Sequence, residues 1–238
     1  MKADGEMAVV NMAKTLVIVG FGPGNATAVA EKFGAEGFSI ALVGRDKDRL
    51  AAGVSALKAR GITASAFQGD AAEPGEMRAA LDKIRAELGS INVINWNAAL
   101  GSADGGDILT ADPTAVRRVF DVAVFGLLAT VNEVLLDLKN AGDGAILITN
   151  GGFGDLAPEA DETAIKLNVM GIALANAAKN KLAGLLAQRL KGDGIYVGEV
   201  IIYGAVKRSP TDNGVDPTSV ANAFWDLYRS RSNLRARV

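Results

Sequence analysis

Short apolar runs alternate with segments of helical periodicity along most of this chain. Residues 15–20 (TLVIVG) form a continuous run rich in β-branched side chains, which predicts a strand buried on both faces. Apolar residues then recur at helical spacing from Asn25 onward, and Gly34 and Gly37 mark the end of that helix. Further apolar runs predict strands at 38–43, 62–67, 91–96, 145–149 and 195–201.

Two Asp-Pro pairs mark the starts of later helices, because Asp caps a helix N-terminus and Pro suits the first turn. Asp112-Pro113 predicts a long helix to about Leu138, and Asp216-Pro217 predicts a helix near the end of the chain. Another long helix is expected at roughly 162–190, after a Gly-rich and acidic loop.

Strands that alternate with helices of this length predict right-handed βαβ units. We therefore expect an α/β fold, with a single Rossmann-like domain whose doubly wound parallel sheet carries helices on both faces. This domain is expected to span residues 14–238 and to follow a flexible N-terminal segment, residues 1–13.

The amino-acid composition of the chain excludes several classes of function. The chain has 238 residues, of which 49% are hydrophobic, and no apolar run approaches the ~18 residues of a membrane span. It contains no cysteine, which fits a cytoplasmic location, and no histidine, which excludes Ser-His-Asp triads and His-rich metal sites. A net charge of −2 with interspersed signs argues against a nucleic-acid partner, and a group of arginines between 229 and 237 is interpreted as solvated surface. We expect neither a metal nor a membrane partner.

A Gly-rich turn, GFGPGNA at residues 20–26, lies where a phosphate-binding loop belongs. It follows the first predicted strand and opens the first helix, where backbone N–H groups and the helix dipole favour an anion. The alternative is a Gly-rich turn without a ligand. The candidate binding residues of this turn are Gly20, Gly22, Pro23, Gly24 and Asn25.

The spacing G-x-x-x-G-x-A in this turn resembles the T-G-x-x-x-G-x-G pattern of the short-chain dehydrogenase/reductase family. Asp70-Ala71 follows the third strand and Asn97-Ala98 follows the fourth, where the family contacts its nicotinamide dinucleotide. The resemblance covers residues 15–230, and the segments at 194–206 and 216–228 are similar to an atypical branch of the family. It implies a dinucleotide cofactor bound by the turn together with Asp70, Ala71, Asn97 and Ala98.

The end of the second strand bears on which dinucleotide is bound. NAD sites usually place an acid there, whereas an arginine accommodates the 2′-phosphate of NADP. This strand ends in Gly44-Arg45, with Lys47 and Arg49 close behind and no acid at the end position. NADP (NADPH) is therefore favoured over NAD; a solvated charge cluster at a helix start is the alternative.

The family's proton-transfer residues have no counterparts at the positions that the resemblance matches. The register of the helix that ends near Leu190 places Ile172 at the Tyr position and Asn176 at the Lys position. Gly151, or at best Asn150, stands at the Ser position, and Ala123 stands at the Asn position. All tyrosines of the chain, Tyr196, Tyr203 and Tyr228, lie outside this helix. The usual proton path is therefore expected to be absent.

Other side chains are candidates for part of that role. Tyr203 is the best placed phenol, and Thr149 or Asn150 could orient a substrate oxygen; packing explains Tyr203 equally well. The loop after Gly151 is longer than its family counterpart and carries several charged residues, which serve either as a general acid or as the surface of a lid. These residues are Asp155, Glu159, Asp161, Glu162 and Lys166.

Three functions fit this pattern. The first is an NADP-dependent oxidoreductase acting on a small carbonyl or alcohol substrate through a non-standard proton donor. The second is a catalytically inactive dinucleotide-binding sensor or assembly partner, and the third is a non-redox enzyme that uses the same pocket. The Ala- and Leu-rich faces of the two long helices correspond to the family's subunit contacts and imply a homodimer or homotetramer; burial of both faces within one subunit is the alternative.

Overall fold

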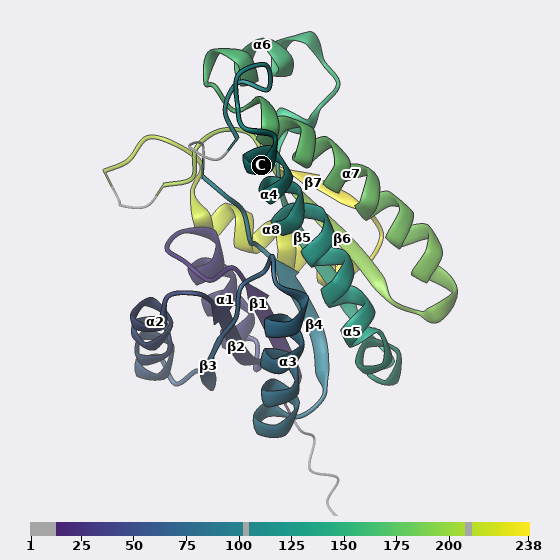
Figure 1. Ribbon diagram of the computed structural model, residues 1–238. Helices are drawn as coiled ribbons and strands as arrows, with labels where there is room; N and C mark the ends of the chain where they lie inside the picture. Colours follow the sequence, from purple (N-terminus) through teal and green to yellow (C-terminus); the bar gives the residue numbers. More distant parts are fainter. Residues whose placement is uncertain (1–12, 102–104, 208–210) are drawn as a thin grey trace, which may run out of the picture.

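Seven parallel strands form one sheet in the order β3-β2-β1-β4-β5-β6-β7 (Figure 1). This computed structural model describes residues 13–101, 105–207 and 211–238. The expected flexible segment, residues 1–13, lies outside the described residues except for its last member. The strand order confirms the doubly wound parallel sheet. The strands are β1 (Thr15–Val19), β2 (Ser39–Gly44), β3 (Ala64–Gln68), β4 (Ile91–Trp96), β5 (Ala145–Gly151), β6 (Tyr196–Ile202) and β7 (Arg235–Arg237).

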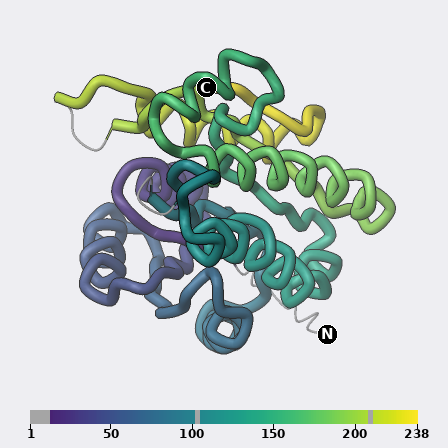
Figure 2. The backbone as a smooth tube through the Cα atoms, turned by 45° about the horizontal axis from the view of Figure 1, so that its top comes forward, coloured from purple at the N-terminus to yellow at the C-terminus, as the bar shows by residue number. Residues whose placement is uncertain are grey.

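Helices cover both faces of the sheet, so each strand can bury side chains on two sides (Figures 1 and 2). One face carries α3 (Pro74–Leu88), α5 (Gly126–Asn140) and α7 (Met170–Leu190). The other carries α1 (Asn25–Ala35), α2 (Lys47–Ala59) and α8 (Pro217–Ser230).

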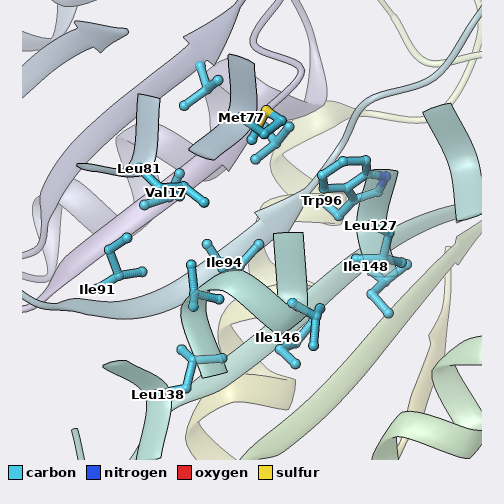
Figure 3. Packing of buried hydrophobic residues seen from close by; sticks show 14 of the residues in the cluster. Val17, Met77, Leu81, Ile91, Ile94, Trp96, Leu127, Leu138, Ile146 and Ile148 are labelled. Carbon is cyan, nitrogen blue, oxygen red and sulfur yellow. The ribbon is translucent and has the colours of Figure 1, made fainter. Parts of the chain in front are cut away.

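The two apolar layers explain the continuous hydrophobic runs of the strands. On the α3, α5 and α7 side, Val17, Ile94, Trp96 and Ile146 are fully buried in one apolar cluster, to which α5 contributes Leu127 (Figure 3). Because the strands are parallel, the carboxyl ends of β1, β2, β4, β5 and β6 lie at one edge of the sheet, where ligands of such folds bind.

The helix predicted from Asp112-Pro113 is one continuous run with a change of pitch. It consists of α4 (Pro113–Phe120), the π-helical segment η2 (Asp121–Phe125) and α5. Asp112 caps it by accepting a hydrogen bond from the Thr114 amide at 2.8 Å. By length and composition, this run is the one helix of the described residues that is apolar enough to cross a membrane. Its buried side chains belong to the core beside the sheet.

The helix predicted at roughly 162–190 is wrong in its first part. The structure has two helices, α6 (Pro158–Lys166) and α7, separated at Asn168, whose φ of 54° is left-handed. The amides of Leu167 and Val169 donate to carbonyls of the last turn of α6, which ends that helix. Asparagine adopts this left-handed conformation more readily than most residues. The spacing of the apolar residues does not reveal the break, because the break depends on the backbone conformation of one polar residue.

The sequence prediction missed the last strand. β7 pairs with β6 in parallel, and Arg235 lies opposite Glu199. Arg235, a member of the arginine group interpreted as solvated surface, is an exposed residue, but its Nε also donates to the fully buried Glu199 carboxylate at 2.8 Å. A three-residue strand with arginines at both ends has no apolar pattern to reveal it.

Candidate active site

A groove of about 640 Å³ opens at the carboxyl ends of β1, β2 and β4. We call it the strand-end groove. It collects most of the predicted binding residues, and its lining includes Gly20, Gly22, Pro23, Arg45, Asp70, Ala71, Asn97 and Ala98. Asn25 lies in the adjoining middle hollow, a space of about 500 Å³ lined by Pro23, Asn25, Asn97, Ala205, Val206, Asp212 and Asn213. Gly24, at the start of α1, is absent from the residues lining either space.

The Gly-rich turn is shaped by close backbone contacts. Gly20 has φ of +86°, and a Cβ at this position would lie 2.5 Å from the backbone nitrogen of Ala98. The Asn97 amide side chain donates to the Gly20 carbonyl at 3.1 Å, and the Asn97 backbone N–H donates to Val19 at 2.9 Å. Only glycine allows β1 and β4 to converge in this way, so the turn is held open toward the groove.

The start of α1 has the properties of an anion site. Gly24 is the N-cap residue, no side chain caps the helix, and no acid lies in its first turn. The Asn25 Oδ1 atom is buried and has no hydrogen-bond partner within the described part of the chain. The free N–H groups of this helix N-terminus fit a bound anion such as a pyrophosphate, and the unpaired Asn25 Oδ1 can accept a hydrogen bond from a donor group of a ligand.

Arginines surround the far end of the strand-end groove. The guanidinium of Arg45 lies 3.8 Å from the Asp70 carboxylate, and that of Arg118 on α4 lies 4.0 Å from the same group. Arg49 lines the groove and pairs with Asp46 at 3.5 Å. Arg45, with Arg49 close behind it, was expected here from the sequence, whereas Arg118 was not, because it is distant in sequence and reaches Asp70 through the packing of α4. Three exposed guanidiniums give this end the charge that a phosphate requires.

The structure brings together the four positions that the family resemblance matched to proton transfer. A Cβ on Gly151 would lie 2.8 Å from the side-chain nitrogen of Asn176, so these residues are direct neighbours. Ala123 of η2 belongs to a small apolar cluster that contacts Ile172. Ile172 is covered from the other side by Gly105, where a Cβ would lie 2.5 Å from the isoleucine side chain. None of these four side chains carries an ionisable group.

The two other side chains proposed to orient a substrate are engaged by the protein. The Thr149 hydroxyl donates to Asn97 Oδ1 at 3.1 Å. The Asn150 amide donates to the Glu199 carboxylate at 2.7 Å and to the Asn176 carbonyl at 3.0 Å, and its oxygen accepts from the Gly151 amide. Asn150 is therefore directed into the interior, where it fixes the end of β5 against α7.

A buried ionic cluster lies beneath this part of the site. Glu199 accepts from Asn150 and from Arg235, and Lys179 of α7 faces the same carboxylate. Lys179 is only 3% exposed, and desolvation lowers its pKa to about 8, although the charge of Glu199 opposes this shift. Within the described residues, Lys179 has no carboxylate within salt-bridge distance. The cluster holds β5, β6, β7 and α7 together. Glu199 interrupts an otherwise apolar strand, a signal that the sequence analysis did not use.

Tyr203 lies where β6 ends, beside a pocket of about 690 Å³ that we call the Tyr203 pocket. Its hydroxyl donates to Asp155, and the guanidinium of Arg237 lies 5.5 Å from its ring centre and 3.5 Å from Asp155. Partial burial, followed by the hydrogen bond to the Asp155 carboxylate, raises the pKa of Tyr203. A Cβ on Gly152 would lie 2.5 Å from the Tyr203 ring, so the phenol packs directly on the loop after β5.

The segment after Gly151 is structured rather than a plain loop. η3 (Gly152–Gly154) and α6 form one wall of the Tyr203 pocket, and Asp155 and Glu159 line it. Asp161 lines a neighbouring apolar pocket of about 330 Å³, whereas Glu162 and Lys166 are exposed. Among the described residues, no group of three or more carboxylate side chains is arranged to hold a metal ion.

Comparison with known proteins agrees with this geometry. Residues 14–207 match the family model described as short chain dehydrogenase. The chain is 29% identical over 184 residues to oxidoreductase asL5 of Sarocladium schorii, an alignment that covers 77% of this chain and 69% of that protein. It is 30% identical over 138 residues to a peroxisomal 2,4-dienoyl-CoA reductase of Arabidopsis thaliana, covering 57% of this chain but only 45% of the relative.

Solved structures share the fold at low sequence identity. L-sorbose reductase of Gluconobacter frateurii, determined with NADPH and L-sorbose, aligns with a TM-score of 0.83 at 21% identity, over 95% of each chain. A metagenomic short-chain oxidoreductase in complex with NADP aligns with a TM-score of 0.79 at 20% identity, over 95% of this chain and 96% of the other. The family match over most of the chain, on a sheet whose strand ends form a groove beside a Gly-rich turn, shows that this protein belongs to the short-chain dehydrogenase family of NAD(P)-dependent oxidoreductases.

Proposed function

We propose that this protein is an NADP(H)-dependent oxidoreductase that does not use the family's usual proton-transfer residues. The observation that carries the proposal is the continuity of the site. The strand-end groove has arginines at one end and shares Pro23 and Asn97 with the middle hollow, which in turn shares Ala205 with the Tyr203 pocket. A dinucleotide laid along this path would reach from Arg45 to the substrate pocket.

The residues along the groove supply the binding groups that such a cofactor needs. The Gly-rich turn and the start of α1 would hold the pyrophosphate, and Asp70 and Ala71 would face the adenosine portion. Arg45, with Arg49 beside it, would hold a 2′-phosphate, which favours NADP over NAD. When bound, the cofactor supplies the hydride; the chain binds and orients both partners and excludes water.

A reductase also needs a proton source when its substrate is a carbonyl compound. Of the described residues that line the Tyr203 pocket, Tyr203 carries the only phenol, and its raised pKa keeps it protonated at neutral pH. Its proton is engaged by Asp155, so donation to a substrate would require that hydrogen bond to break. As a base in the oxidative direction it is poor, because the Asp155 carboxylate disfavours its phenolate form.

Cofactor choice is tested by measuring NADPH and NADH binding to the wild type and to Arg45→Ala by intrinsic fluorescence and calorimetry. We expect the variant to lose about ten-fold or more in NADPH affinity and little in NADH affinity, because a charge-assisted hydrogen bond to the phosphate is removed. Arg60→Ala is a matched control, since Arg60 is equally exposed, at 61% against 60% for Arg45, and pairs with Glu31 instead. Equal loss for both dinucleotides would refute the role of Arg45.

A second candidate is a dinucleotide-binding protein without turnover, acting as a sensor or assembly partner. It is favoured by the state of the matched catalytic positions, where Ile172 packs under Gly105 and Asn150 is held in the interior. Tight NADPH binding combined with no turnover on any oxidised substrate would support it. Turnover above the rate without enzyme would exclude it.

We also propose that the protein assembles as a homodimer or homotetramer in the cytoplasm. The helices α5 and α7 run across the same side of the molecule (Figures 1 and 2). Large apolar side chains remain exposed on both, namely Leu128, Leu136, Leu174 and Leu185. Exposed apolar side chains on adjacent helices are typical of subunit contacts. Sedimentation of the wild type and of a Leu136→Glu, Leu185→Glu double variant tests this; a wild type that sediments as a monomer would contradict it.

A further inference from the structure

The Tyr203 pocket combines an apolar interior with aromatic faces. Leu167, Val169 and Ile202 contribute aliphatic surface, while Phe153 and Tyr203 contribute rings. The ring of Tyr203 already has a cation beside it, the guanidinium of Arg237 at 5.5 Å. Electron-rich ring faces in an apolar pocket attract organic cations.

The charged groups that line the pocket are both acidic. They are Asp155 and Glu159, and no lysine or arginine is among the described residues that line it. Arg237 neutralises part of the Asp155 charge at 3.5 Å. Glu159 has no ion-pair partner within the described part of the chain and lies in the first turn of α6, whose N-terminus offsets part of its charge, so the pocket keeps a carboxylate without a cationic partner at its α6 wall.

The residues matched to proton transfer restrict which substrates can be reduced easily. Hydride addition to a ketone produces an alkoxide, which must be protonated. Gly151, Ile172 and Asn176 cannot supply that proton, and the Tyr203 proton is held by Asp155. A substrate that already carries a positive charge on its heteroatom removes the requirement, because hydride addition then leaves a neutral product.

We propose that the substrate of the Tyr203 pocket is an organic cation, a cyclic or aryl-substituted iminium ion, which the protein reduces to an amine. This inference rests on the proposed NADP(H) dependence. Hydride adds to the iminium carbon, and the C=N π electron pair moves to nitrogen, which becomes a neutral amine. The reduced dinucleotide is oxidised in the same step, and no proton is consumed. The carboxylates and rings of the pocket hold the cation, and its apolar walls accept the ring system.

Binding of the cation is measured without the cofactor. The probe is N,N-dimethyl tetrahydroisoquinolinium, a quaternary cation that cannot be reduced, and the reference is its neutral carbon analogue, dimethyltetralin. We expect calorimetry to show tighter binding of the cation. Glu159→Gln should weaken it about three-fold, as for an exposed charge pair, and leave the neutral analogue unaffected. Glu162→Gln is the matched control, because Glu162 is exposed on the same helix but does not line the pocket.

A second variant separates the ring contribution from the charge. Phe153→Leu keeps an apolar side chain in the pocket wall and removes one aromatic face. We expect Phe153→Leu to lower the affinity for the cation about three-fold and the affinity for the neutral analogue by less. Equal affinity of wild-type protein for the cation and its neutral analogue would overturn the proposal, whatever the variants do.

Turnover distinguishes this inference from the proposed function. NADPH oxidation is followed with the N-methyl iminium of dihydroisoquinoline and with tetralone, a ketone of similar shape, against a reaction without enzyme. Reduction of the iminium at least ten-fold faster than the ketone is the expected result. Faster reduction of the ketone would overturn the iminium assignment and leave NADP(H) dependence intact. Reduction of neither, with NADPH bound, would overturn both and favour the nucleotide-binding protein.

Discussion

Lys179 is predicted to make the stability of this protein rise with pH. Its side chain is buried between α7 and the sheet, and burial lowers its pKa from an ordinary value of 10.5 to about 8. The unfolded chain therefore binds more protons than the folded protein between these two values. In that window the free energy of unfolding increases with pH, and below about 8 the full cost of the buried ammonium is present.

The size of the effect follows from the shift. A fall from 10.5 to about 8 corresponds to about 3 kcal/mol, at ~1.4 kcal/mol for each pKa unit. Lys179→Met replaces the ammonium by an apolar side chain of similar length. At about pH 7 the variant should be more stable than the wild type by up to ~3 kcal/mol, and this difference should shrink toward zero near pH 10.

Urea denaturation at a series of pH values measures the difference directly. Lys181→Met is the matched control, because Lys181 lies on the same helix but is exposed, and it should leave the pH dependence unchanged. Comparing variants at each pH cancels the contributions of the other titrating groups, which the variants share. A stability difference between Lys179→Met and wild type that stays constant across the range would show that Lys179 does not titrate there.

Three further substitutions follow from the same contacts. Gly20→Ala should abolish NADPH binding and lower the melting temperature by several degrees, because its Cβ would overlap the Ala98 backbone; binding close to that of wild type would contradict the geometry of the turn. Gly126→Ala should reduce the soluble yield and the melting temperature, since its Cβ would overlap the carbonyl oxygen of Ala71; an unchanged melting curve would count against it. Glu199→Gln should cost about 3 kcal/mol or more in urea denaturation, because two cations lose their shared anion; a change under ~1 kcal/mol would argue against the buried cluster.

Much of the fold was predictable because its signals are local. Parallel strands covered on both faces are apolar at most positions, so β1 and β2 appear as nearly uninterrupted runs in the sequence, whereas Asn92 and Asn95 interrupt β4. The Gly-rich turn was predictable for a related reason: the convergence of β1 and β4 excludes a Cβ at Gly20. The boundaries of α6 and α7 were not, because one asparagine in a left-handed conformation ends α6 without disturbing the helical spacing.

The candidate site likewise has parts that the sequence predicts and parts that it does not. The position of Arg45 after β2 follows from chain order alone, since it is the first side chain beyond the strand. The partners of Glu199 do not follow from chain order, because they come from β5, β7 and α7, which are separated by up to about a third of the chain. The spacing of apolar and polar residues along the chain does not show which of several polar residues will face a buried carboxylate.

The sequence by itself determined a parallel, doubly wound sheet with a glycine turn at the mouth of its first crossover, because backbone sterics and the burial of strands act on neighbouring residues. The tertiary structure alone decided that Asn150 faces the interior, that Lys179 is buried near the Glu199 carboxylate that Arg235 binds, and that Tyr203 donates to Asp155 beside an acidic, aromatic pocket. Those contacts join residues far apart in sequence, and their energies depend on desolvation and distance, which exist only once the layers have packed.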